Sequence, residues 1–152
     1  MKTPEEIRQV ALSTIEDETL AISRLKSYID HGFVEAVKII LHCKGRVVVT
    51  GVGKSAIIAG KIVATFNSTG TPAVFMHAAD AIHGDLGMIQ KGDVVMCISN
   101  SGNTPEIKIL TPMLKSLGAA LIGMVGNTAS HLAIESDIVI NTTVEKEAMM
   151  GN

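Results

Sequence analysis

Hydroxyl and amide side chains cluster between residues 99 and 104, where the sequence predicts a strand followed directly by a helix. The segment Asp93–Ile98 is short, apolar and rich in β-branched residues, which is typical of a buried parallel strand. Thr104 suits the N-cap of the next helix, and Pro105 suits its first turn. The turn between these elements carries a candidate ligand-binding set, namely Ser99, Asn100, Ser101, Asn103 and Thr104.

This combination of a helix N-terminus with several hydroxyls favours binding of a phosphate group. The first N–H groups of a helix have no partner within it, and the helix dipole places partial positive charge at that end. Ser99, Ser101 and Thr104 add neutral hydrogen-bond donors, which suit a phosphate monoester that must also be released. An ordinary capped turn would need only one such hydroxyl. The sequence therefore predicts a phosphate site in this loop.

A second glycine-containing loop, residues 51–56, follows the first predicted strand and begins the next helix. It does not fit a P-loop, because the residue five positions before Gly53 is Val48 instead of the required glycine. A dinucleotide-binding fingerprint is also disfavoured, since no acidic residue stands about 20 positions further on, where that site requires one. What remains is a backbone that can approach a ligand closely, beside the cation of Lys54 and the hydroxyl of Ser55.

The rest of the chain predicts an α/β fold with N-terminal helices. Apolar segments of strand length alternate with segments of helical periodicity, which indicates a parallel sheet covered by helices on both faces. Ligands of such sheets bind beyond the carboxyl ends of the strands, where the strand order reverses. A capping box at residues 3–6 begins a first helix that we expect to reach about Asp30, with a break at His31-Gly32. The predicted strands are 46–50, 73–75, 93–98, 120–125 and 137–140, and the later helices are 33–42, 54–67, 104–117 and 130–135.

The composition is typical of one globular domain with an aliphatic core. The chain has 152 residues, of which 47% are hydrophobic and 3% aromatic. We expect a single domain over 1–152, with helices in 1–45 and the α/β core in 46–152. A net charge of −2 and the lack of a basic cluster argue against a nucleic-acid partner. No signal peptide or membrane-spanning run is recognisable. Cys43 and Cys97 form no CxxC pair and lie in apolar segments, which indicates buried, reduced thiols of a cytoplasmic protein.

Five segments, taken in order along the chain, carry a family resemblance: 51–55, 65–72, 81–87, 98–102 and 144–148. They resemble the sugar isomerase (SIS) domain, and specifically that of the arabinose-5-phosphate isomerases. The resemblance runs from the N-terminal helices to the last residue. It implies a flavodoxin-like five-stranded sheet in a three-layer α/β/α sandwich, and assembly as dimers or tetramers. It also implies interconversion of ribulose 5-phosphate and arabinose 5-phosphate, which feeds synthesis of the lipopolysaccharide or capsule sugar 3-deoxy-manno-octulosonate.

Position by position, the resemblance implies two groups of site residues and no metal or other cofactor. Isomerisation through an enediol needs a base beside the carbonyl and a donor for the developing oxyanion. We expect Glu147 to be the base, Lys54 to polarise the oxygen, and His83 to carry a proton between oxygens. The histidines show no metal-ligand spacing. The phosphate-binding hydroxyls match Ser55, Ser99, Ser101 and Thr104, lined by Gly53, Asn100 and Asn103, and the catalytic-type positions match Lys54, His83, Glu106 and Glu147.

Each catalytic-type residue also has a structural explanation. A carboxylate such as Glu106 is favoured in the first turn of a helix by the helix dipole alone. Lys54 could be a solvated loop residue, and His83 lies in a glycine-flanked turn where histidine is ordinarily structural. Glu147 belongs to a charged run that would suit a solvated segment.

The sequence departs from the family pattern after Glu147-Ala148. The family continues there with Cys-Pro, a Thr/Ser-rich segment with a helix over the phosphate loops, and a His-Pro-Gly-Gly motif that contributes a histidine. Full-length members often add two CBS domains, which are not present in this sequence. Two functions therefore stay open: an isomerase, or a phosphosugar-binding and sensing module without catalysis, including a fragment of a longer chain.

Overall fold

Five parallel strands form the centre of the molecule, in the order β2-β1-β3-β4-β5. The computed structural model describes residues 2–146. The predicted α/β sheet is confirmed, with small shifts at the strand ends. The chain leaves the central pair β1 and β3 in opposite directions, which is the flavodoxin-like arrangement. The strands are β1 (Val47–Gly51), β2 (Ala73–His77), β3 (Val94–Ser99), β4 (Ala120–Val125) and β5 (Ile138–Asn141).

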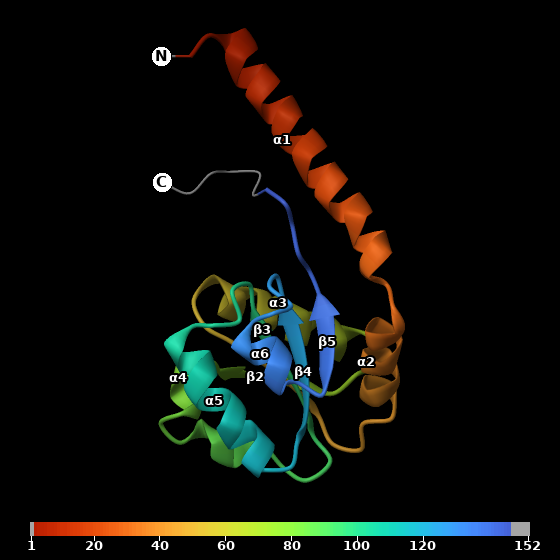
Figure 1. The fold of residues 1–152 in the computed structure, drawn as a ribbon, viewed down its shortest axis with the longest axis vertical. Helices are drawn as coiled ribbons and strands as arrows, with labels where there is room; N and C mark the ends of the chain where they lie inside the picture. The colour runs from red at the N-terminus through yellow and green to blue at the C-terminus, as the bar shows by residue number, and fades with distance from the viewer. Residues whose placement is uncertain (1, 147–152) are drawn as a thin grey trace.

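Helices cover both faces of this sheet and produce the expected three-layer sandwich (Figure 1). On one face α2 and α3 pack against the strands, and on the other face lie α4, α5 and α6. Both interfaces are aliphatic, as the low aromatic content predicts. The elements are α2 (His31–Leu41), α3 (Lys54–Ser68), α4 (Ala78–Ala81), α5 (Pro105–Ser116) and α6 (His131–Glu135), with short 3₁₀ helices η1 (Leu25–Tyr28) and η2 (Asp85–Met88).

The central strands β1 and β3 are buried along their whole length. Helices cover both of their faces and strands flank both of their edges, which is why their sequences are continuous apolar runs. Within β3, burial raises the pKa of the Cys97 thiol to about 12, so this side chain stays protonated and inert. Cys43 differs from the expectation of a buried thiol: it is half-buried, and its Sγ donates to the Gly92 carbonyl at 3.3 Å.

The first helix, α1 (Pro4–Arg24), begins as predicted but ends earlier. Thr3 and Glu6 form the reciprocal capping box, and these hydrogen bonds hold the pKa of the Glu6 carboxyl below its usual value. The helix ends at Arg24 instead of near Asp30, and η1 continues its apolar periodicity as a tighter turn. The predicted break at His31-Gly32 is also wrong. The Asp30 side chain accepts from the Phe33 N–H and caps α2, so His31 and Gly32 belong to the first turn of that helix.

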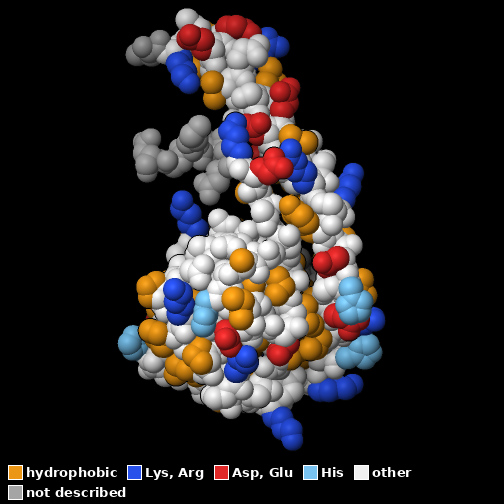
Figure 2. Space-filling model, viewed as in Figure 1, with side chains coloured by type: hydrophobic (Ala, Val, Ile, Leu, Met, Phe, Trp, Pro, Cys, Tyr) orange, Lys and Arg blue, Asp and Glu red, His pale blue; other side chains and the backbone are white. Residues whose placement is uncertain are grey.

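Helix α1 projects from the body of the fold, and the segment after β5 returns beside it (Figure 1). Two ion pairs connect them, Arg24 with Glu145 and Lys146 with Asp17. None of the residues of α1 is buried, and its apolar side chains alternate with charged ones on the surface (Figure 2). Among residues 2–146, the structure contains no helix whose length and hydropathy would allow it to span a bilayer.

At the amino ends of the strands, Asp93 ties β1 to β3. Its buried carboxylate accepts from the backbone N–H groups of Arg46 and Gln90 and from the Arg46 guanidinium. Burial alone would raise the pKa of this carboxyl, but the hydrogen bonds from Gln90 and Arg46 outweigh it and lower the pKa. The network fixes the edge of the sheet opposite to the predicted site.

Candidate functional site

The two predicted loops lie side by side at the carboxyl edge of the sheet. Gly51, the last residue of β1, is in register with Ile98 of β3, so the loops that follow these strands are neighbours. This is the point where the strand order reverses, and parallel sheets bind their ligands there. The fold therefore brings Lys54 and Ser55 to the same edge as residues 99–104, which we call the β3–α5 loop.

The β1–α3 loop depends on glycine at two positions. Gly53 is the N-cap of α3 with φ +58° and ψ −129°, a conformation that other residues adopt only at a cost. A β-carbon on Gly51 would lie 3.0 Å from the Ser55 carbonyl carbon and 3.1 Å from the Ile98 carbonyl oxygen, so the end of β1 has little room for a side chain. Lys54 begins α3 and is exposed, while Ser55 is half-buried.

The hydroxyls of the β3–α5 loop are oriented by the loop's own backbone. Ser99 Oγ accepts from the Gly102 N–H at 3.1 Å, and Ser101 Oγ accepts from the Asn103 N–H at 3.3 Å. A serine hydroxyl that accepts in this way still has its own hydrogen to donate. Ser99 is buried and Ser101 is exposed. Both can therefore serve as donors to an anion at the N-terminus of α5.

The β4–α6 segment supports this loop from outside. The Gly126 N–H donates to the Asn100 carbonyl and the Leu132 N–H donates to the Gly102 carbonyl, both at 3.0 Å. Ser130, whose hydroxyl caps α6, lies directly against Gly102. The residue pattern predicts no functional role for Ser130. A serine directly before an apolar helical segment predicts an N-cap. This pattern does not predict which distant residue the capping serine contacts.

Thr104 differs from its expected role as a capping side chain. It occupies the N-cap position of α5, with φ −62° and ψ 149°, yet its side chain makes no capping hydrogen bond. Its Oγ1 is buried and has no partner among the described residues, as is also true of Thr50 Oγ1 in β1. Buried hydroxyls normally have a partner, so the unpaired Thr104 hydroxyl at the start of α5 agrees with the predicted role of Thr104 as a donor to a ligand.

The catalytic-type residues are less closely assembled. Glu106 is half-buried in the first turn of α5. His83 is exposed between α4 and η2, where its backbone N–H donates to the Asp80 carbonyl. Within residues 2–146, neither a hydrogen bond nor an ion pair links Lys54, His83 and Glu106. Glu147 lies outside the described residues, so its role stays a prediction.

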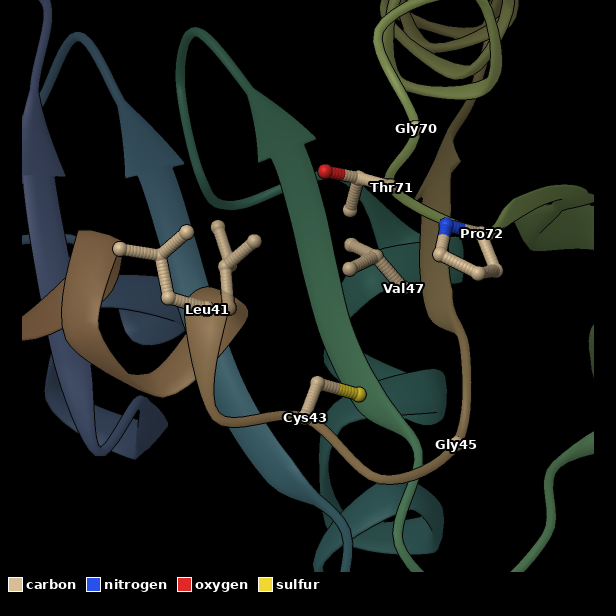
Figure 3. Close-up of a pocket in the computed structure, with 8 residues that line it drawn as sticks. Leu41, Cys43, Gly45, Val47, Gly70, Thr71 and Pro72 are labelled. Atoms are coloured by element: carbon tan, nitrogen blue, oxygen red, sulfur yellow. The ribbon is translucent and has the colours of Figure 1, made fainter.

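Five hollows in the surface of residues 2–146 lie away from the predicted site residues. One lies at the opposite, amino edge of the sheet, between the end of α2 and the starts of β1 and β2 (Figure 3). Leu41, Cys43, Val47 and Pro72 give it an apolar lining without a charged side chain. In the part of the chain that the structure describes, His, Cys, Asp and Glu side chains do not gather in threes as a metal site would require. The polar loops at the carboxyl edge therefore remain the candidate site.

Comparison with known proteins identifies the family. The model of the SIS domain matches residues 40–152. The chain belongs to the SIS domain family. This SIS domain is 49% identical over 138 residues to the arabinose 5-phosphate isomerase KdsD of Pseudomonas aeruginosa, and 47% identical over 135 residues to GutQ of Escherichia coli K12. These matches cover 91% and 89% of this chain but 42% of each relative.

Solved structures agree with that assignment. An Escherichia coli CFT073 protein in complex with arabinose 5-phosphate superposes with a TM-score of 0.88 at 41% identity, over 97% of this chain and 79% of that one. A putative sugar-phosphate isomerase from Listeria monocytogenes gives a TM-score of 0.93 at 39% identity, over 98% of this chain and 78% of that one. The resemblance to arabinose 5-phosphate isomerases seen in the sequence is thereby confirmed.

Proposed function

We propose that this SIS domain binds arabinose 5-phosphate and ribulose 5-phosphate and forms the core of an isomerase that interconverts them. The observation that carries the proposal is the hydroxyl-rich β3–α5 loop at the sheet's switch point, in a chain 47–49% identical to arabinose 5-phosphate isomerases. The phosphate would receive hydrogen bonds from Ser99, Ser101 and Ser55, together with the free N–H groups at the start of α5. These donors are neutral, so the product phosphate can also leave.

The chemistry requires a proton to move between adjacent carbons. A base removes the proton beside the carbonyl, the carbonyl oxygen gains negative charge, and the resulting enediol takes a proton at the neighbouring carbon. Lys54 at the start of α3 would stabilise the developing oxyanion, and His83 would carry a proton between the two oxygens. Glu147 is our candidate base, with Glu106 as the alternative carboxylate. We further propose that the protein works in the cytoplasm, in the synthesis of 3-deoxy-manno-octulosonate.

One observation favours a second function, which is binding of phosphosugar without catalysis: the phosphate-binding loop is held by hydrogen bonds, and the catalytic-type residues that the structure describes are not connected to one another. The β3–α5 loop is held by hydrogen bonds within itself and to the β4–α6 segment, whereas no hydrogen bond or ion pair connects Lys54, His83 and Glu106 within residues 2–146. A domain that binds phosphosugar without converting it would need only the assembled part. An isomerase fits the same observation, because catalytic contacts often tighten only when substrate binds.

One pair of measurements separates these functions. Conversion of ribulose 5-phosphate is followed in a coupled assay, and binding of arabinose 5-phosphate is followed by calorimetry on the same preparation. Turnover supports the isomerase, and binding without turnover supports the sensing module. Absence of binding by either sugar phosphate would refute both.

A further inference from the structure

The side-chain amide of Asn103 is engaged at both ends. Its Nδ2 donates to the Ser101 carbonyl at 3.1 Å, within the β3–α5 loop. Its Oδ1 accepts from the backbone N–H of His131 at 3.0 Å, which lies 28 positions away at the start of α6. The amide therefore connects the loop to α6 through one hydrogen bond on each side.

These two bonds use one N–H of Nδ2 and one lone pair of Oδ1 in a structural connection, although the sequence placed Asn103 among the ligand-binding residues. Its backbone N–H is also in use, because it donates to Ser101 Oγ at 3.3 Å. Asn103 thus holds Ser101 from two directions, at the carbonyl and at the hydroxyl. We infer that Asn103 is a positioning residue, anchored by the His131 N–H, that sets the orientation of the Ser101 hydroxyl toward a bound phosphate. This inference rests on the proposed sugar-phosphate site.

The His131 N–H, which anchors Asn103, can be removed selectively, because it is a backbone group at the start of a helix. His131 is the first residue of α6, a position where proline is well tolerated and has no N–H to donate. The preceding Ser130 has φ −77° and ψ 163°, the extended conformation that a following proline favours. His131→Pro would therefore delete the hydrogen bond to Asn103 Oδ1 while leaving the helix intact.

His131→Ala is the matched control. The His131 side chain contacts Thr111, with 2.8 Å between Nε2 and Oγ1, and both substitutions remove that contact. Only the proline variant also removes the N–H. The difference between the two variants therefore isolates the anchor of Asn103.

The experiment compares wild type, Asn103→Ala, His131→Pro, His131→Ala and the Asn103→Ala/His131→Pro double variant. Binding of arabinose 5-phosphate and of inorganic phosphate is measured by calorimetry, and hydrogen exchange is measured for peptides covering residues 99–104. We expect roughly three- to tenfold weaker binding for Asn103→Ala, and for His131→Pro relative to His131→Ala, the effect of about one lost hydrogen bond. The loop amides should exchange faster in the same variants. Beyond the effect of His131→Ala alone, the double variant should be no weaker than Asn103→Ala, because the loss of the His131 N–H and the loss of the Asn103 amide act on one connection.

Three results would overturn the inference. If Asn103→Ala weakens binding while His131→Pro matches His131→Ala, Asn103 contacts the ligand directly. If loop exchange is unchanged in both variants, Asn103 does not hold the loop. If exchange increases but affinity does not change, the orientation of Ser101 has no effect on binding. Failure of the wild-type chain to bind either probe would refute the proposed function, and loop exchange would then still show whether Asn103 holds the loop.

Discussion

Gly102 and Ser130 lie so close that a β-carbon on residue 102 would overlap both Oγ and Cβ of Ser130. Gly102 also has φ +62°, a left-handed conformation that disfavours any side chain. The contact joins the β3–α5 loop to the N-cap of α6, so the position of one loop depends on the other.

Replacing Gly102 with alanine should therefore lower both stability and sugar-phosphate affinity. The left-handed conformation costs about 1–2 kcal/mol, and overlap with Ser130 adds roughly 1–3 kcal/mol. Gly118→Ala is a matched control, because Gly118 has φ +70° with open space around its would-be β-carbon. Urea unfolding should show a larger loss for Gly102→Ala, and adding Ser130→Gly should recover part of it. Equal losses at the two glycines would show that the contact with Ser130 is unimportant.

Replacing Ser99 and Ser101 together with alanine should weaken sugar-phosphate binding by roughly 2–4 kcal/mol. Each lost hydrogen bond to the charged phosphate accounts for about 1–2 kcal/mol. The fold should persist, because Ser99 ends β3 and Ser101 lies in the turn after it, so neither belongs to the aliphatic core. Thermal unfolding checks this. Ser116→Ala, at the other end of α5, is the control and should bind normally. Unchanged affinity in the double variant would remove the β3–α5 loop from the site.

Replacing Glu147 with glutamine tests the base, in a form of the protein that shows turnover. Glutamine keeps the size of the side chain but cannot accept the proton, so kcat should fall by roughly 10²–10⁴ with binding nearly unchanged. Exchange of solvent deuterium at the carbon beside the carbonyl should stop as well. Lys54→Met offers a contrast, since weaker polarisation should slow turnover and exchange together with some loss of affinity. Deuterium exchange at the normal rate in Glu147→Gln would move the base to Glu106 or His83.

We expect α1 to mediate self-association. Its apolar residues Ile15 and Ile22 are 60% and 67% exposed, and a spacing of seven places them on one face. A dimer or tetramer should therefore sediment at micromolar concentration, and Ile15→Glu/Ile22→Glu should shift it toward monomer. Ser13→Glu, on the opposite side of the helix, is the control. A monomeric wild type would contradict the prediction.

Asp93 should make stability depend on pH in the acidic range. Its pKa is lowered in the folded state, so its contribution is present above the unfolded value of about 3.9 and is lost as pH falls through the folded value. At pH 7, Asp93→Asn should lower the free energy of unfolding by about 1–3 kcal/mol, because the bonds to Arg46 and Gln90 weaken. The difference from wild type should shrink in acid. The exposed Asp80→Asn serves as control, and a pH-independent difference would contradict the assignment.

Local patterns in the sequence predicted every strand and the site loops. The apolar run 94–98 is short and rich in β-branched residues, which is typical of a buried strand. The Thr3–Glu6 capping box is complete within four neighbouring residues. The boundary between α1 and α2 differs from the prediction, because the apolar periodicity of α1 continues through η1. The sequence pattern therefore does not distinguish Asp30 as the N-cap of α2. The resemblance of segments 51–55 and 98–102 to the SIS family is likewise recognisable from the amino-acid sequence alone.

Tertiary structure alone decided which of these local features meet. The strand order placed Gly51 beside Ile98, and helix packing brought the His131 N–H to Asn103 and Ser130 to Gly102. It also left Thr104 Oγ1 without the capping bond that its sequence position favours. The physical reason is that elements form through periodicity and capping between near neighbours. The partner of each loop hydrogen bond depends instead on how distant segments pack around the sheet.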